Sequence, residues 1–407
     1  MKPFAALDHL VRSLPDGWKT VPLMRVARLV EEQNILGDVP LLSLTIRGEL
    51  VPRSDEVQPP SGEYLLKYGL VSPGDLVVNP MWLNGGSIGV SKVAGAVSPE
   101  YRIYRFTADI DPRFIHHLVR LKHYMDQYRL LVRAETTFDR RVTKEDFRAL
   151  PLLLPPRSEQ TKIADYLDAE TARIDGIIER KRSMTDLLAE RMHAQVDQVL
   201  ASLGDGIDMR RIKYLARVNQ RSLPETAPPE LEIRYADIST VGRGVLVAEP
   251  ELMEFGVAPS RARRLVRAGD TIISTVRTYL RAVLSIDAEL EGLVVSTGFA
   301  VLSPNQDVEP RYLAWAIQAG PFIEEIVARS VGISYPTINA SEIGALSVPV
   351  PTLGRQKQVA DFLDEARERL ARITSCLDRQ VDELREGRQA ITTAAVTGAF
   401  KIEAVAA

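Results

Sequence analysis

The sequence predicts a mixed α/β (α+β) fold, with two tandem domains of strands and short helices separated by two long helices that form an antiparallel coiled coil. Three observations support this prediction: a long helical text that occurs twice, shorter motifs that repeat in the same order, and a periodic apolar stripe in each long helix. A chain of 407 residues is also long enough for two or three domains. We expect the domain, helix, domain and helix at 1–156, 157–203, 204–353 and 354–407.

The clearest repeat lies where the two long helices begin. Residues 154–178 read LPPRSEQTKIADYLDAETARIDGII, and residues 349–373 read PVPTLGRQKQVADFLDEARERLARI. The polar residues that recur at matching places are Gln160, Asp165 and Asp168 in the first segment and Gln356, Asp361 and Asp364 in the second. The same proline-preceded helix is therefore encoded once in the middle of the chain and once near its end.

The segments before each helix repeat as well. LVSPGDLVVNP at 70–80 matches LVRAGDTIIST at 265–275, and EDFRALPLLLPP at 145–156 matches SEIGALSVPVP at 341–351. In each pair, Gly-Asp is typical of a tight turn, and the β-branched residues after it predict a short strand. Helices are expected near 112–132 and 310–329, because proline favours the first helical turn. The common order of these motifs predicts two tandem copies of one unit.

Apolar residues in the long helices follow the alternating three- and four-residue spacing of a coiled-coil seam. The predicted seam residues are Leu167, Ile174, Ile177, Met184 and Leu188 in the first helix and Leu363, Leu370, Ile373, Leu377 and Leu384 in the second. A pseudo-twofold relation between the repeats would make their pairing antiparallel. The pair is either a hairpin that only adds stability or a spacer that holds two equivalent domains apart, and the duplication favours the spacer.

Composition excludes several classes of protein. No apolar run reaches 18 residues, so we expect no membrane partner, and one cysteine, Cys376, excludes an internal disulfide and fits a cytoplasmic location. No cysteine–histidine cluster has zinc spacing, and we expect neither a metal nor a cofactor. The net charge of −3 hides a local excess, since six arginines and one acid lie within 261–281. Such a basic segment is typical of nucleic-acid binding.

The chain contains three longer motifs: LPLLLPPRSEQTKIADYLDAETARID at 150–175, GDLVVNPMWLNGGSIGVS at 74–91 and AITTAAVTGAF at 390–400. Together they resemble the specificity subunits of type I restriction-modification systems. The resemblance extends over the whole chain in the order recognition domain, helix, recognition domain, helix. The second unit departs from it at LGRQ (353–356), where the first has RSEQ, and NGGSIG (84–89) has no counterpart after Thr275.

The resemblance implies a DNA-binding protein that is not itself an enzyme. Each recognition domain would read one half of a bipartite target in double-stranded DNA. The two helices would set the gap between the halves and dock two methyltransferase (M) subunits. Restriction and translocase (R) subunits join such a complex when it cleaves DNA.

The resemblance also places DNA-contacting residues in one loop of each unit, before the segment that leads into the long helix. The candidates in these loops are Thr137, Arg140, Arg141 and Thr143 in the first unit and Ser334, Tyr335, Thr337 and Asn339 in the second. Arginine can grip guanine or a phosphate, and asparagine can read adenine. Arg277 and Arg281 would supply cations to the second unit. For each residue, ordinary surface polarity is the alternative.

One motif suggests an enzyme instead. VVNPMW at 77–82 resembles the Asn-Pro-Pro-aromatic loop of amino-group DNA methyltransferases, in which Asn79 would hold the target amino group and Trp82 would stack on a flipped base. Met81 replaces the second proline, however, and the glycine-containing TVGRG at 240–244 lies in the other unit. The motif therefore predicts either a DNA contact by Trp82 or a tryptophan packed in the domain, and an adenine methyltransferase-like enzyme is the alternative reading.

A third class is a bivalent coiled-coil scaffold that binds proteins. The arginine excess beside the helices disfavours it. Phosphate contacts impose a steep salt dependence on binding, so a salt titration with DNA would separate the two classes.

Overall fold

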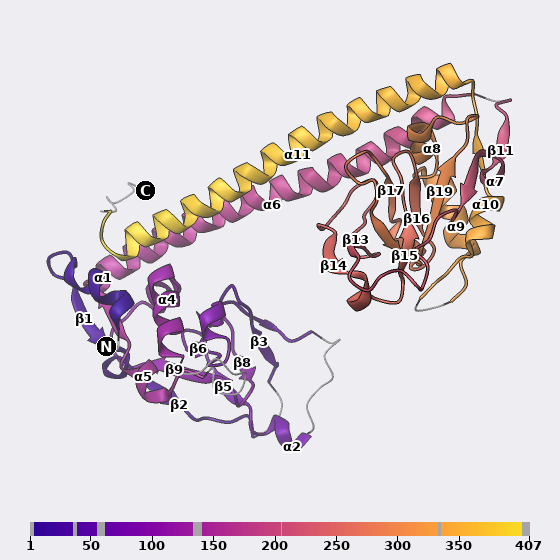
Figure 1. Cartoon of the computed structure of the whole chain (residues 1–407). Helices are drawn as coiled ribbons and strands as arrows, with labels where there is room; N and C mark the ends of the chain where they lie inside the picture. Colours follow the sequence, from indigo (N-terminus) through magenta and orange to yellow (C-terminus); the bar gives the residue numbers. More distant parts are fainter. Residues whose placement is uncertain are drawn as a thin grey trace. The chain divides into compact units, whose positions relative to one another are not determined.

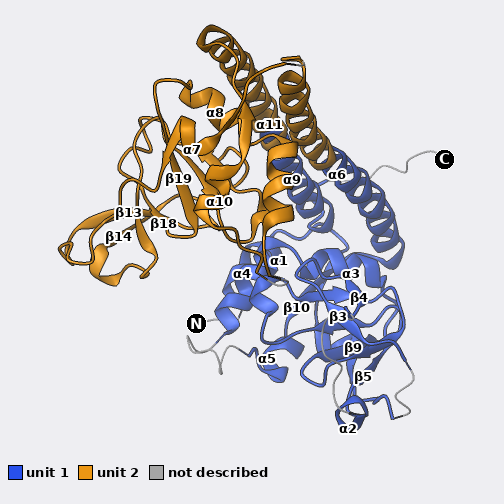
Figure 2. Cartoon of the chain, turned by 90° about the vertical axis from the view of Figure 1, so that its right-hand side faces the viewer, with its two compact units in different colours: residues 1–180, 379–407 blue, residues 181–378 orange. Residues whose placement is uncertain are grey.

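The computed structural model describes residues 4–35, 39–54, 62–132, 141–204, 206–332 and 335–400. The chain forms two compact units, which Figure 2 shows in blue and orange. Unit 1 comprises residues 1–180 and 379–407, and unit 2 comprises residues 181–378. This division differs from the boundaries expected from the sequence, because each unit includes part of both long helices.

Unit 1 is built around a four-stranded antiparallel sheet in the order β2-β9-β6-β7, with three two-stranded pairs, β1-β10, β3-β4 and β5-β8. Its strands are β1 (Lys19–Pro22), β2 (Ala27–Val30), β3 (Leu42–Leu44), β4 (Leu50–Pro52), β5 (Gly69–Val71), β6 (Leu76–Val78), β7 (Ile88–Val90), β8 (Gly95–Val97), β9 (Arg102–Phe106) and β10 (Pro151–Leu154). Its short helices are η1 (Ala5–Leu7), α1 (Asp8–Arg12), η2 (Leu23–Arg25), α2 (Gly62–Leu65), η3 (Leu83–Gly85), α3 (Pro112–Val119), α4 (Lys122–Leu131) and α5 (Lys144–Arg148).

Unit 2 repeats this plan with the four-stranded sheet β12-β19-β16-β17, a second sheet β14-β13-β18-β15 and the pair β11-β20. Its strands are β11 (Met209–Arg211), β12 (Ala216–Val218), β13 (Glu232–Ala236), β14 (Glu251–Glu254), β15 (Ala262–Leu265), β16 (Thr271–Ser274), β17 (Val283–Ser285), β18 (Val294–Ser296), β19 (Phe299–Pro304) and β20 (Ser347–Pro349). Its short helices are α7 (Ile212–Leu215), η4 (Phe255–Val257), η5 (Thr278–Leu280), α8 (Pro310–Ala316), α9 (Gly320–Arg329) and α10 (Ala340–Ala345).

The Gly-Asp turns occupy equivalent places in the two units. Gly74 precedes β6 with φ of 91°, and Gly269 precedes β16 with φ of 87°, a conformation that glycine adopts without strain. The strands that were expected after these turns are present. The helices expected over 112–132 and 310–329 are each broken into two, since Leu121 and Ala319 have extended backbone angles. Gly320-Pro321 marks the second break in the sequence, whereas no glycine or proline marks the first.

The long helices are α6 (Arg157–Ala201) and α11 (Leu353–Val396), drawn in magenta and yellow-orange in Figure 1. Within unit 1 they pack antiparallel: residues later in α6 contact residues earlier in α11. The ring of Tyr166 lies 6.0 Å from that of Phe400, and Asp175 Oδ1 lies 3.2 Å from Arg388 Nε. Further along α6, Ile178 joins a buried cluster with Val381.

The buried stripe along the helices differs in part from the predicted seam. Leu167, Ile174, Leu363 and Leu377 are buried, and Leu188, Leu370 and Leu384 are partly buried. Ile177 is partly buried as well, whereas Met184 (49% exposed) and Ile373 (44% exposed) lie off the buried stripe.

Two other apolar residues are buried in their place. Ile178 and Val381 are each only 6% exposed. The stripe also includes Thr171, whose Oγ1 donates to the carbonyl oxygen of Leu167. The predicted seam contained only apolar residues, so it left out Thr171 although this polar residue lies on the buried stripe.

Each end of the helix pair is part of a domain core. In unit 1, Ile163 and Leu167 of α6 and Val396 of α11 belong to the same core as the buried rings of Tyr104 and Phe147. In unit 2, Val359 and Leu363 of α11 and Met192 of α6 belong to the core of that unit. The start of each long helix is thus buried in the domain that precedes it in the chain.

Candidate nucleic-acid interface

The repeated glutamine fastens each helix to its own domain. Gln160 is 3% exposed; its Oε1 accepts a hydrogen bond from the Asp111 amide (2.9 Å) and its Nε2 donates to the Pro155 carbonyl (2.9 Å). Gln356 is 1% exposed and makes the same pair of bonds, accepting from the Glu309 amide and donating to the Pro351 carbonyl, both at 2.8 Å. A buried amide with both ends paired orients the helix, because either end would be costly to leave unsatisfied.

The repeated aspartates complete this anchor. In unit 1, Arg113 Nη1 lies 2.7 Å from Asp165 and 3.3 Å from Asp168. In unit 2, Arg311 lies 2.9 Å from both Asp361 and Asp364. The residues that the two helices share are therefore those that bind the helix to the first turn of α3 or α8.

We expect the anchor of unit 1 to be sensitive to acid. Burial opposes ionisation of Asp111, but hydrogen bonds from Arg113 and Arg157 outweigh it and lower the pKa of this carboxyl below its ordinary value. A carboxylate with a lowered pKa stabilises the fold above the unfolded-state pKa, and this stability is lost as the pH falls below about 4. Unfolding measured between neutral and acid pH should show a smaller pH dependence for Asp111→Asn. Asp109→Asn, at an exposed carboxylate, is the control, and equal pH profiles for all three proteins would contradict the prediction.

The Asn-Pro-Met-Trp segment of unit 1 forms a turn at the end of β6. Asn79 is 9% exposed, its Oδ1 accepts from the Met81 amide at 3.1 Å, and its own amide donates to the Ser87 carbonyl. Trp82 is 61% exposed. The turn therefore uses Asn79 to shape the backbone and presents the indole to solvent, so Trp82 is not packed in the domain core.

The loop before α5 lies beside this turn. Arg141 Nη2 is 3.7 Å from the sulfur of Met81 and 2.7 Å from Glu100 Oε2. Thr143 caps α5, because its Oγ1 accepts from the Asp146 amide at 3.0 Å and donates to the Asp146 carboxylate. The structure thus places Arg141 against Met81, the residue before the exposed Trp82, while the Thr143 hydroxyl is engaged in the cap. Thr137 and Arg140 lie outside the described residues.

The equivalent loops of unit 2 also lie together. The Arg277 amide donates to the Pro336 carbonyl at 2.8 Å, Val276 forms a β-bridge with Thr337, and the Arg277 guanidinium lies 5.0 Å above the centre of the Tyr335 ring. Tyr335 is 65% exposed. This region therefore also combines an arginine with an exposed aromatic ring. Ser334 lies outside the described residues.

Backbone strain is concentrated at the same place. Arg277 and Arg281 have φ of 49° and 55°, and they flank η5. Non-glycine residues adopt this left-handed conformation at an energetic cost, which is more common at functional sites. The tip between them carries Tyr279, which is 53% exposed and was not selected from the sequence.

Two other polar candidates have structural roles. Thr337 exchanges backbone hydrogen bonds with Val331 at 2.9 and 3.0 Å. Asn339 is the N-cap residue of α10, and its amide donates to Glu342 Oε2 at 3.0 Å. Both side chains are exposed, so these roles leave them at the surface of the loop. Glu100, which neutralises Arg141, was missed because no motif in the sequence marks it.

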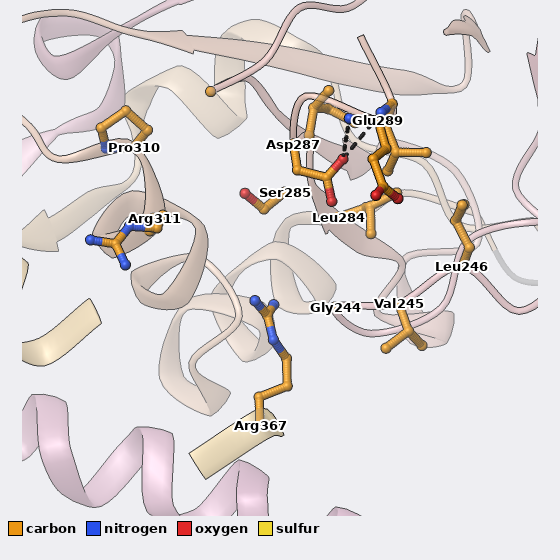
Figure 3. A pocket seen from close by; sticks show the side chains of 13 residues that line it. Gly244, Val245, Leu246, Leu284, Ser285, Asp287, Glu289, Pro310, Arg311 and Arg367 are labelled. Atoms are coloured by element: carbon orange, nitrogen blue, oxygen red, sulfur yellow. Dashed lines mark hydrogen bonds between the residues drawn. The ribbon is translucent and has the colours of Figure 1, made fainter. Parts of the chain in front are cut away.

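A groove of about 550 Å³ lies in unit 2 where the domain faces α11. Figure 3 shows Arg311 and Arg367 on one side and Asp287 and Glu289 on the other. Both arginines already bind Asp364, at 2.9 and 3.1 Å, and the Asp287 carboxylate accepts from backbone amides of its own turn. The charges of Arg311, Arg367 and Asp287 are therefore used within the protein, and the groove is a poor candidate for a substrate site.

Two kinds of feature are absent from the described residues. No helix among them is both long enough and apolar enough to cross a membrane. No group of three or more His, Cys, Asp or Glu side chains in those parts of the chain could hold a metal ion.

Comparisons by sequence identify relatives of one kind, although no family model matches the chain. The HindI specificity subunit of the type I restriction enzyme of Haemophilus influenzae is 27% identical over 127 residues, which are 30% of this chain and 28% of that protein. The StySPI specificity subunit from Salmonella potsdam is 27% identical over 97 residues, 24% of this chain and 21% of that protein. The match thus spans less than a third of the length of these curated relatives.

Comparisons of structure extend over most of the chain. A chain from a structure described as the basis of complex assembly and conformational transition of the type I R-M system has a TM-score of 0.72 at 18% identity, covering 95% of this chain and 100% of that one. The HsdS subunit from Thermoanaerobacter tengcongensis has a TM-score of 0.50 at 18% identity, covering 95% and 98%. At these identities the likeness concerns the fold. In sequence and in fold, the chain is therefore similar to the specificity subunits of type I restriction-modification systems.

Proposed function

We propose that this chain is the DNA sequence-recognition subunit of a type I restriction-modification complex and that each domain reads one half of a bipartite target. The observation that carries the proposal is the duplicated site. After β6, the exposed Trp82 follows Met81, which Arg141 contacts; after β16, Arg277 lies over the ring of the exposed Tyr335. One chain with two such sites is suited to a target with two parts.

The chemistry of each site suits DNA. Arginine can bind guanine through two hydrogen bonds or clamp a phosphate, and an aromatic ring can contact bases or sugars. In unit 2 the guanidinium already lies over the Tyr335 ring, which limits its freedom before DNA binds. The ion pair of Arg141 with Glu100 joins two half-exposed side chains, so it can open at low cost.

The remaining features assign roles to the helices and partners. We propose that α6 and α11 set the gap between the half-sites and dock two methyltransferase subunits, with restriction subunits joining the complete complex. The chain itself would supply no catalysis, because Asn79 shapes its own turn and Met81 stands where the methyltransferase motif has proline.

The test is to express the chain with the methyltransferase of its own locus and map methylated bases across the host genome. We expect a two-part motif that disappears when the gene for this chain is deleted. A motif that persists without the chain would overturn the proposal. Methyl transfer to DNA by the purified chain alone would favour the enzyme alternative, and the absence of salt-sensitive DNA binding by the complex would favour the scaffold.

We expect Arg141→Ala and Arg277→Ala to relax different halves of that motif. A base-reading arginine is worth about 1–3 kcal/mol of discrimination at its position, so one base in one half-site should become variable. Sequencing of duplexes selected from a randomised library measures both halves together. Arg12→Ala, at an exposed arginine paired with Asp8, should leave the motif intact. If both loop variants select the wild-type motif, these arginines do not read bases.

A further inference from the structure

An Arg-Gly pair occurs at equivalent turns of the two units. Arg47-Gly48 lies in the turn between β3 and β4, and Arg243-Gly244 lies in the connection between β13 and β14. Gly48 and Gly244 both have φ of 77°. In each turn backbone hydrogen bonds close the loop, from Gly48 to the Thr45 carbonyl and from Gly242 to the Val245 carbonyl. The duplication therefore includes this turn, which the sequence repeats described above did not include.

In unit 1 the turn is tied to the segment that follows Trp82. Arg120 Nη1 donates to the carbonyls of Gly86 and Ile88, both at 2.7 Å, and Nη2 donates to the Ile46 carbonyl at 3.1 Å. The backbones are in close contact, because a Cβ on Gly89 would lie 1.8 Å from the Gly48 carbonyl oxygen. The Arg47 turn is thus held against the segment that follows Trp82.

In unit 2 the turn lies against the segment that follows Arg281. Gly244 donates to the Val283 carbonyl at 2.7 Å, and Val283 donates to the Gly242 carbonyl at 3.1 Å. Here the arginine belongs to the turn itself: Arg243 Nη2 donates to the carbonyl of Gln318, the residue equivalent to Arg120, at 2.7 Å. Burial and the neighbouring Arg281 lower the pKa of Arg243, consistent with an inward-facing guanidinium.

The two units hold this turn with different arginines, and in unit 1 this leaves Arg47 free to bind an external group. Arg120 provides the tether there, and Arg47 is exposed and makes no hydrogen bond or ion pair with any described residue. Its neighbour Ile46 is 71% exposed. Glu49 is the one acid of the 45–49 turn and forms no ion pair with Arg47, so the Arg47 guanidinium can bind an external partner.

We propose that Arg47 binds a DNA phosphate beside the half-site read by unit 1 and that Arg120 is the positioning residue that fixes its turn next to Trp82. This inference rests on the proposed function. In unit 2 the equivalent Arg243 is committed to the fold, and the adjacent Arg281 provides the cation instead.

The test uses the complex of the chain with its methyltransferase subunits and a duplex that carries the two-part motif. Each phosphate contact contributes about 0.9 to the slope of log affinity against log salt. Arg47→Ala should therefore weaken binding and flatten the slope by about that amount, without changing the selected motif. Arg47→Lys should keep the slope, and Arg12→Ala should behave as wild type. Arg243→Lys, which retains the charge at the inward-facing position, should leave the slope unchanged.

Arg120→Gln introduces the residue that unit 2 has at the equivalent position, Gln318. We expect it to relax the sequence requirement in the unit 1 half-site and to leave the other half intact. Adding Arg47→Ala to this variant should lower the affinity for DNA little further, since the effects of coupled residues are not additive. A general loss of folding would instead weaken both half-sites equally and would count against the positioning role.

The outcomes separate the two proposals. If the wild-type complex binds bipartite DNA and Arg47→Ala binds with the same affinity and salt slope, the inference about Arg47 is wrong and the proposed function stands. If the wild-type complex shows no salt-dependent binding to DNA, both are wrong.

Discussion

Gln160→Leu is expected to lower the free energy of unfolding of unit 1 by about 2–6 kcal/mol, because it leaves two buried backbone groups, the Asp111 amide and the Pro155 carbonyl, without partners at about 1–3 kcal/mol each. Leucine is similar in size to glutamine, so loss of hydrogen bonds rather than loss of packing dominates the effect. Hydrogen exchange followed by mass spectrometry measures the change separately in peptides from each unit.

Gln356→Leu is the matched experiment in unit 2, where the Glu309 amide and the Pro351 carbonyl lose their partners. Each substitution should weaken its own unit first. Gln389→Leu, at an exposed position of α11, is the control and should change stability by less than about 0.5 kcal/mol. If Gln160→Leu and Gln389→Leu have equal effects, the buried amide is not the anchor of α6.

A four-residue insertion after Met184 in α6, matched by one after Cys376 in α11, is expected to widen the gap in the recognised target by about two base pairs. Four residues add about 6 Å of helix and slightly more than one turn, so the buried stripe stays close to register. Successive base pairs are about 3.4 Å apart along DNA. Methylome sequencing would show the gap directly, and the sequences of the two half-sites should not change.

A seven-residue insertion at the same two places provides a graded response, since it adds about 10 Å of helix. The gap should then grow by about three base pairs. A four-residue insertion after Glu249, in an exposed connection of unit 2, is the control and should leave the gap unchanged. An unchanged gap in both helix variants would mean that α6 and α11 do not set the spacing.

The sequence by itself determined the duplicated plan of the protein. Turn, strand and helix-start signals are local, so Gly74-Asp75 and Gly269-Asp270 predict the same turn wherever the chain folds. The repeated Gln160 and Gln356 marked the helix starts for a reason that the contacts then explained, since both are buried anchors. The resemblance to specificity subunits rested on these same segments and agrees with the comparisons of sequence and fold.

The tertiary structure decided which residues lie side by side. Ile177 was expected on the helix stripe, but it is only partly buried while its neighbour Ile178 is buried, because burial depends on where the partner helix lies and not on apolar character alone. The pairing of Arg141 with Met81, and of Arg277 with Tyr335, joins segments distant in sequence.

The same holds for the arginines of the duplicated turn. From the sequence alone, Arg47 and Arg243 are equally good candidates for a DNA contact, since each precedes the glycine of an equivalent turn. Only the fold shows that Arg243 donates to the Gln318 carbonyl while Arg120 takes over the tether in unit 1. Whether an arginine is free to bind DNA depends on which donor satisfies the nearby carbonyl groups, and these groups come together only when the chain folds.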